Sequence, residues 1–308
     1  MIKITKRLSV NEIEEYLINN HNLTIFLGMN DYEGTKEDRN GLIYNIYKNK
    51  NLHHNLISIK RENDSYYLLE ENFNKNNNNK LKWDNLNSFF KEYLSNKKTK
   101  TKTILFDITD LDLDTLIHII PLVLDYKIIY IYTIPEKYSS ANFTIKTKKI
   151  SQPQGYCLIN TKNNYLSSHI ILLGLDELRA YKFILNYGWA IDKLKLISVK
   201  DNVDNCESRL INANNFLNNQ FKPNQFIEIN LLNYDEIIQI IEEELLKNDS
   251  IDIIPLGPKP VLFNILLYYF KNYNTLKDKV RFLYDFPTKL DNRTQGIKEI
   301  CFSEINFK

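Results

Sequence analysis

The chain of 308 residues has room for two domains of ordinary size. Hydrophobic residues make up 43% of it and charged residues 25%, a balance that allows a buried core and excludes a chain disordered throughout. Lys and Arg (40) nearly balance Asp and Glu (38), so the whole surface is not built for nucleic acid or an anionic membrane, and such binding must be local.

Cysteine usage and hydropathy indicate the compartment. The three cysteines are widely spaced and form no Cys-x-x-Cys pair, which argues against a disulfide framework and against a zinc site. Residues 1–7 are charged without a following apolar run, and no stretch approaches the ~20 apolar residues of a membrane span. We therefore expect a cytoplasmic protein with no membrane partner.

The first half of the chain predicts an irregular α/β unit. Ser9 and Glu12 stand at capping-box spacing and predict a helix to about residue 18. In chain order there follow an apolar strand ending at Gly28, a candidate hairpin at 55–60 and 66–70, an exposed Asn-rich loop at 72–80, a helix at 84–94 and a strand at 103–106.

The second half alternates strands and helices more regularly. Short apolar runs predict strands at 169–174, 194–199, 226–232, 251–256 and 280–284, and the segments between them predict helices at 177–187, 205–217, 235–247 and 260–272. Asn233 and Glu236 give the third of these helices an imperfect capping box. Such alternation is typical of a parallel sheet covered by helices on both faces.

Two motifs recur in the same order. An apolar run ending in Leu-Gly places Gly28 and Gly174 alike, and a Tyr-x-apolar-Pro-x-Lys motif contains Tyr132 and Tyr284. The glycine and the tyrosine are 104 positions apart in the first copy and 110 positions apart in the second. The repeat predicts two tandem Rossmann-like units, residues 1–150 and 151–308, although similar strand–loop–helix units also arise by convergence.

The segment Gly257-Pro258-Lys259-Pro260 is the leading site candidate, because it follows a buried-looking strand and opens a helix. Helix N-termini at the carboxyl ends of parallel strands attract anions. Gly257 would let a phosphate approach the backbone, Lys259 would add a charge, and Pro260 suits a first helical turn. A stiff loop with a solvated lysine explains the segment equally well.

This segment resembles the Gly-Thr-Lys-x-apolar motif of the CARF domain, a Rossmann-like sensor of cyclic oligonucleotides in CRISPR-linked and related antiphage systems. Gly257, Lys259 and Val261 match the motif, whereas Pro258 lacks the hydroxyl and the N–H of the usual threonine. A tandem pair also resembles SAVED sensors, in which two such halves form one ligand surface. In the first copy, Asp107 begins an acidic Asp-Ile-Thr-Asp loop that would repel phosphate.

Further candidates follow Gly174. Asp176 and Glu177, like Asp31 and Glu33 in the first copy, could bind ribose hydroxyls or a metal or act as acid and base, or could only favour a helix N-terminus. Arg179 could pair with Asp176 or face the ligand. Tyr284 and Tyr132 could each stack a base at the sheet edge or simply end a core strand.

These features predict a ligand-sensing subunit in a prokaryotic defence system. Its candidate ligand-binding residues are Gly174, Asp176, Glu177, Arg179, Gly257, Lys259 and Tyr284. The expected ligand is a nucleotide or phosphorylated small molecule, with a cyclic oligonucleotide as one candidate, and a partner protein is expected to carry the effector. No cofactor is indicated.

Two other functions fit the same residues. One is a hydrolase or transferase acting on a nucleotide or sugar phosphate with Asp176 and Glu177 in catalytic roles, although the chain has no P-loop, GxGxxG, GxSxG or HExxH motif. The other is a non-catalytic interaction subunit. The basic runs at 97–102 and 146–149 leave local nucleic-acid binding open, although solvated linkers explain them too.

Overall fold

A computed structural model shows a mixed α/β protein with two compact units, Met1–Glu136 with Thr294–Lys308, and Lys137–Arg293. No helix among the described residues is both long and apolar enough to cross a membrane. The structure describes residues 2–20, 23–28, 39, 41–50, 52, 55–61, 66–71, 79–97, 103–138, 144–146, 150–153, 167–175, 177–200, 215, 217, 219–220, 226–231, 233–285, 288–289 and 294–306.

The first unit contains an eight-stranded sheet in the order β1-β17-β7-β6-β2-β3-β4-β5. Its four middle strands, β7, β6, β2 and β3, are parallel, and the strands outside them pair antiparallel. The eight strands of the sheet are β1 (Ile2–Leu8), β2 (Leu23–Gly28), β3 (Asn55–Arg61), β4 (Tyr66–Glu71), β5 (Asn79–Lys82), β6 (Thr103–Asp107), β7 (Lys127–Ile134) and β17 (Glu299–Asn306). The short strand β16 (Thr294–Gln295) belongs to the unit but not to this sheet. The helices are α1 (Val10–Asn19), α2 (Leu42–Lys50), α3 (Trp83–Lys97) and α4 (Leu113–Val123).

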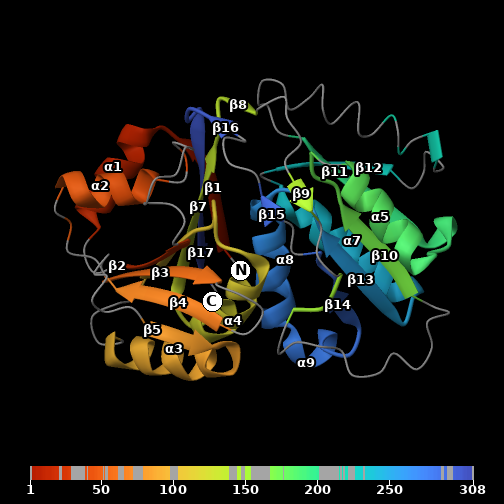
Figure 1. Ribbon diagram of the computed structural model, residues 1–308, viewed down its shortest axis with the longest axis horizontal. Helices are drawn as coiled ribbons and strands as arrows, with labels where there is room; N and C mark the ends of the chain where they lie inside the picture. The colour runs from red at the N-terminus through yellow and green to blue at the C-terminus, as the bar shows by residue number, and fades with distance from the viewer. Residues whose placement is uncertain are drawn as a thin grey trace. The chain divides into compact units, whose positions relative to one another are not determined.

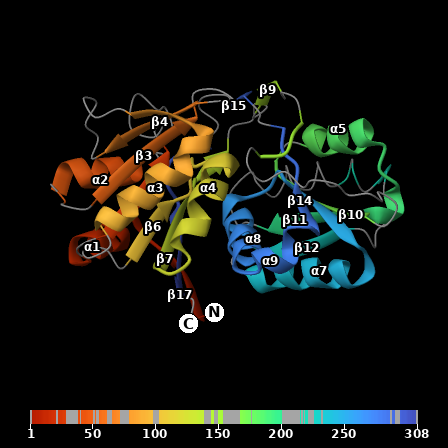
Figure 2. The same cartoon turned by 90° about the horizontal axis from the view of Figure 1, so that it is seen from below.

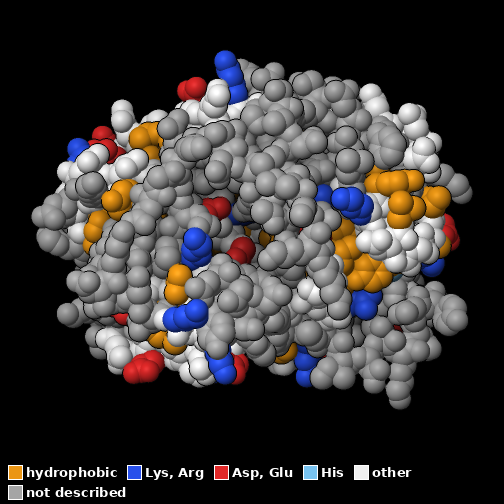
Figure 3. All heavy atoms as spheres, in the orientation of Figure 1, with side chains coloured by type: hydrophobic (Ala, Val, Ile, Leu, Met, Phe, Trp, Pro, Cys, Tyr) orange, Lys and Arg blue, Asp and Glu red, His pale blue; other side chains and the backbone are white. Residues whose placement is uncertain are grey.

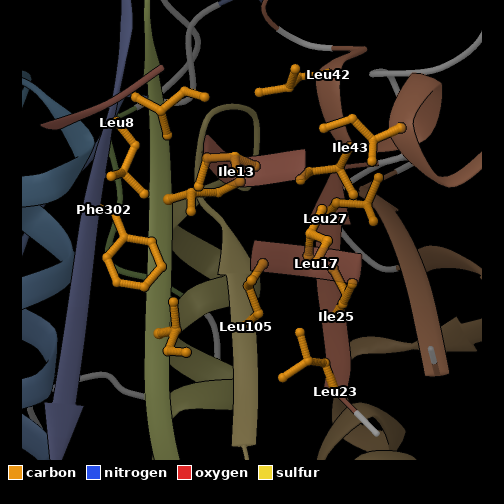
Figure 4. Packing of buried hydrophobic residues seen from close by; sticks show 14 of the residues in the cluster. Leu8, Ile13, Leu17, Leu23, Ile25, Leu27, Leu42, Ile43, Leu105 and Phe302 are labelled. Carbon is orange, nitrogen blue, oxygen red and sulfur yellow. The ribbon is translucent and has the colours of Figure 1, made fainter. Parts of the chain in front are cut away.

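Helices cover both faces of this sheet (Figure 1). Side chains alternate along a strand, so Ile25 and Leu27 of β2 face α1 and α2 while Phe26 faces α3. Figure 4 shows the layer against α1 and α2, in which Leu27 and Leu105 lie among the buried side chains. On the other face, the rings of Phe26 and Phe90 meet edge to face with centroids 5.6 Å apart. The parallel strands are therefore buried on both sides.

Two local predictions for the first unit are confirmed. The Ser9 side chain accepts from the backbone N–H of Glu12 at 3.3 Å, and Glu12 accepts from the backbone N–H of Ser9 at 2.7 Å, which completes the capping box of α1. Strands β3 and β4 pair antiparallel, with Ile59 opposite Leu69, as expected of a hairpin.

The C-terminal strand β17 lies between β1 and β7 and pairs antiparallel with both. The division predicted at residue 150 had assigned this segment to the second unit, whereas its contacts place it in the first. Buried and exposed side chains do not alternate along β17, because four consecutive residues, Ile300 to Ser303, are buried. Its sequence pattern therefore does not indicate which sheet the strand joins.

The second unit contains a five-stranded parallel sheet in the order β12-β11-β10-β13-β14. Numbered along the chain, this order is 3-2-1-4-5, a strand order of doubly wound α/β folds. The five strands of the sheet are β10 (Ser167–Leu172), β11 (Leu194–Lys200), β12 (Phe226–Asn230), β13 (Ser250–Pro255) and β14 (Val280–Phe282). The short strands β8 (Lys137–Tyr138), β9 (Thr144–Lys146) and β15 (Thr288–Lys289) lie outside this sheet. The helices are α5 (Glu177–Tyr187), η4 (Ile191–Lys193), α7 (Tyr234–Lys247), α8 (Lys259–Lys271) and α9 (Tyr273–Leu276).

Figure 2 shows α5 on one face of this sheet and α7 and α8 on the other. All five predicted strands of the sheet are confirmed, as are the helices predicted at 177–187, 235–247 and 260–272. Most of the helix predicted at 205–217 lies outside the described residues. The capping box predicted at Asn233 is wrong, because the Asn233 amide donates to the Glu236 side chain at 2.7 Å and caps no backbone N–H.

Candidate functional site

The candidate site lies at the carboxyl edge of β10 and β13 in the second unit. From β10 the chain continues to β11 on one side, and it later returns to β13 on the other side. Connections that leave neighbouring strands in opposite directions open a crevice where ligands of this fold class bind. Gly174 follows β10 and Gly257 follows β13, so two predicted site residues lie where the connections of the sheet diverge.

The two glycines allow the loops after β10 and β13 to cross closely. A methyl group on Gly174 would collide with the carbonyl oxygen of Leu256, and one on Gly257 would lie 2.9 Å from the carbonyl oxygen of Leu173. The sequence suggested that Gly257 admits a phosphate, but the structure gives it a second role in loop packing. Both glycines remain half-buried at the edge.

Lys259 is the first residue of α8 and is half-buried. Its predecessor Pro258 is the N-cap and makes no side-chain capping bond, while Pro260 lies in the first turn, as predicted. Because both prolines lack an N–H, the backbone donors of this first turn come from Lys259 and Val261. The helix start thus combines a partial positive charge with the lysine ammonium.

Arg179, in the first turn of α5, forms a buried ion pair with Asp285. Its Nε donates to Oδ2 of Asp285 at 2.9 Å, and its Nη2 donates to Oδ1. Its guanidinium also lies over the ring of Tyr284, 5.7 Å from the centroid. Burial alone would lower the pKa of Arg179, but the hydrogen bonds to Asp285 outweigh it and raise that pKa. The partner of Arg179 is therefore Asp285, whereas Asp176 lies outside the described residues.

The other predicted residues are placed in part. Glu177 begins α5, but its side chain is outside what the structure describes, as are Asp31 and Glu33. Tyr284 is half-buried just after β14 and exchanges two backbone hydrogen bonds with Ser151, at 2.9 and 3.0 Å. The structure therefore brings together the loop glycines, and separately the Arg179–Tyr284 pair, at the same edge of one sheet.

A second polar cluster was missed by the sequence reasoning. His169, Asp252 and Arg281 lie side by side on β10, β13 and β14. Asp252 accepts from Nε and Nη2 of Arg281 at 2.6 and 2.7 Å and lies 2.9 Å from Nδ1 of His169. Burial alone would raise the pKa of Asp252, but the bonds from His169 and Arg281 lower it.

Aromatic rings fix this cluster in place. The His169 ring stacks on Trp189 with centroids 4.2 Å apart, and Trp189 stacks on Tyr187 at 4.9 Å. His169 and Asp252 are each the third residue of a six-residue strand, so the cluster lies toward the amino ends, away from Gly174 and Gly257. A charged residue inside the apolar run at 251–254 was the signal that could have revealed it.

The first unit has an arginine–tyrosine pair like that of the second. Arg39, shortly before α2, lies over the ring of Tyr132 at 5.9 Å from the centroid, and its Nη1 donates to the carbonyl of Thr133 at 3.5 Å. Tyr132 and Tyr284 are the repeat positions noted in the sequence, but Arg39 was overlooked. Arg39 follows Gly28 by 11 residues, whereas Arg179 follows Gly174 by five. Because these spacings differ, the sequence did not show that the two arginines correspond.

The surface of the second unit also carries apolar side chains. Leu185, Tyr187 and Ile191 are exposed at the end of α5 and in η4. Figure 3 shows hydrophobic side chains gathered over this region.

Comparison of the chain with known proteins found no matching family model, no matching curated protein and no matching solved structure.

Proposed function

We propose that the second unit binds a nucleotide or another phosphorylated small molecule at the carboxyl edge of β10 and β13. The observation that carries the proposal is the crossing of the loops at Gly174 and Gly257, directly before the start of α8 at Lys259. This is the point in a 3-2-1-4-5 sheet where connections leave neighbouring strands in opposite directions, and it combines backbone donors with a lysine. An anionic phosphate has the charge and the acceptor oxygens that such donors bind.

The proposal includes an internal duplication. In each unit the first strand of the repeat, β2 or β10, lies between the next strand of the chain and a later pair, β6 and β7 or β13 and β14. The Arg39–Tyr132 and Arg179–Tyr284 pairs occupy matching places in that order. Both similarities support two tandem Rossmann-like units that arose from one ancestor.

The wider role as a sensing subunit rests on the resemblance of the 257–261 segment to CARF domains. In that role the ligand, for example a cyclic oligonucleotide, changes how the chain engages an effector protein. The predicted catalytic alternative depends on Asp176 and Glu177, whose side chains are not described, and it stays a prediction.

Identifying the bound molecule tests the proposal. We expect protein purified from its own cells to release a phosphorylated compound on denaturation, detected by mass spectrometry. The Lys259→Ala variant should release much less of it. Lys271→Ala removes the same charge from the last turn of α8 and is the matched control. Equal release from both variants would contradict the site.

A further inference from the structure

The end of α5 and the short helix η4 carry an apolar patch on the second unit. In the described part of the chain, seven large hydrophobic side chains are exposed, and three of them, Leu185, Tyr187 and Ile191, lie close together in the sequence. Their exposed fractions are 60%, 40% and 45%. Single exposed apolar residues are ordinary on a protein surface, whereas a group of them indicates an interaction surface. We call these three residues the α5 patch.

Stacked rings hold Tyr187 of the α5 patch in place. Its ring stacks on that of Trp189 with centroids 4.9 Å apart, and Trp189 stacks on His169 at 4.2 Å. His169 is buried, and its Nδ1 lies 2.9 Å from the carboxylate of Asp252, so the stack ends on a fixed polar cluster. A side chain that is already ordered loses little conformational entropy on binding, and tyrosine is among the residue types that dominate interface energies.

The margin of the α5 patch carries both signs of charge. Asp192 and Lys193 are neighbours in η4, and Lys182 is exposed on α5, one turn before Leu185. None of these three charged side chains forms an ion pair with another residue that the structure describes. Figure 3 shows charged side chains at the margin of the hydrophobic side chains in this region.

These charges favour a second copy of this chain as the occupant. A partner with one sign of charge would be attracted by a margin of the opposite sign, but this margin combines both signs. In a two-fold symmetric dimer the same patch faces itself, and every contact occurs twice. Because opposite charges are adjacent in η4, such symmetry can set Asp192 against Lys193 of the partner subunit in both halves of the interface.

We propose that the second unit forms a two-fold symmetric homodimer through the α5 patch, with Leu185 and Tyr187 at the centre and two contacts between Asp192 and Lys193 at the margin. The patch precedes β11 and therefore lies at the amino edge of the sheet, whereas Gly174 follows β10 at the carboxyl edge. Dimerisation is thus independent of phosphate binding. A patch of this size gives a weak dimer, with a dissociation constant in the micromolar range.

Sedimentation of the full chain over a range of concentrations tests the proposal. We expect the mass to rise from 36.6 kDa toward twice that value as the concentration passes through the micromolar range. Leu185→Asp should weaken dimerisation by more than about tenfold, because it places a charge at the centre of the interface. Leu246→Asp is the matched control, since Leu246 is 88% exposed on α7, on the other face of the sheet (Figure 2).

Charge reversal tests the symmetry itself. Asp192→Lys and Lys193→Asp should each weaken dimerisation about threefold to tenfold, because each sets like charges against one another. The two variants mixed together should associate more tightly than either does alone, since opposite charges then meet at both contacts. A wild type that stays monomeric up to several hundred micromolar, equal weakening by Leu185→Asp and Leu246→Asp, or no gain on mixing the charge variants would overturn the proposal.

Discussion

Arg179 and Asp285 form a two-pronged ion pair that ties the first turn of α5 to the segment just after β14, 106 residues further along the chain. Both side chains are buried, with 11% of the arginine and 2% of the aspartate exposed. Breaking such a pair leaves one charge buried without compensation.

Removing the carboxylate of Asp285 should therefore destabilise the second unit. We expect Asp285→Asn to lower the free energy of unfolding by about 3–5 kcal/mol, measured by urea denaturation. Glu228→Gln is the comparison, because the Lys200–Glu228 pair is 64% and 53% exposed and should contribute at most about 1 kcal/mol. Similar losses of unfolding free energy in the two variants would show that burial does not determine how much each ion pair stabilises the fold.

The cluster of Asp252, His169 and Arg281 should make stability depend on acid pH. The pKa of Asp252 is lowered in the folded protein from the ordinary value of 3.8, so the stabilisation that its carboxylate provides is fully present above pH 3.8. The contribution is lost as the pH falls through the folded pKa, because the unfolded chain binds the proton first. Denaturation curves between pH 2 and 6 should show a smaller acid-side loss for Asp252→Asn than for the wild type. Parallel curves would argue against the cluster.

His118, on α4, should produce a second pH dependence at milder acidity. Burial lowers its pKa to about 4 from 6.5, so the unfolded state takes up a proton that the folded state resists. Stability is therefore complete above pH 6.5 and declines as the pH falls toward 4, by about 3 kcal/mol in total. In His118→Gln the unfolding free energy should lose this slope between pH 7 and 4. A slope that persists in the variant would assign it to other groups.

The loop crossing should not tolerate a side chain on Gly174. Because a methyl group there collides with the backbone of Leu256, we expect Gly174→Ala to lower the melting temperature by several degrees and to disrupt ligand binding. Gly188 is the control: it has open space around it and φ of +58°, so alanine costs only backbone strain of about 1 kcal/mol. If Gly188→Ala proved the more damaging change, close packing would not be the reason for Gly174.

Much of the second unit could be predicted from its sequence, because each parallel strand is a short apolar run bounded by polar turns. The same pattern could not assign β17, whose partners β1 and β7 lie far away in the chain. The residues at the site were only partly predictable. Local spacing found Gly257 and Lys259, whereas the partner of Arg179 lies 106 residues away and no local pattern pointed to it.

His169 and Asp252 illustrate the same limit. Each looks like an isolated polar residue within a strand, and only the pairing of β10 with β13 sets them opposite one another. Arg39 was hidden because its spacing from Gly28 differs from the spacing in the second unit, although both arginines lie over the repeated tyrosine. Contacts across a sheet depend on which strands become neighbours, and the local pattern of a strand does not identify a neighbour that lies far away in the chain.

Calorimetric titration of the full chain with inorganic pyrophosphate tests the central claim most directly, since this probe carries phosphate and no sugar. We expect the wild type to bind it and Lys259→Ala to bind it about 10- to 100-fold more weakly, the loss of a charge-assisted hydrogen bond. Lys271→Ala should bind like the wild type. Equal affinities for the two lysine variants, or no binding by the wild type, would contradict a phosphate site at the start of α8.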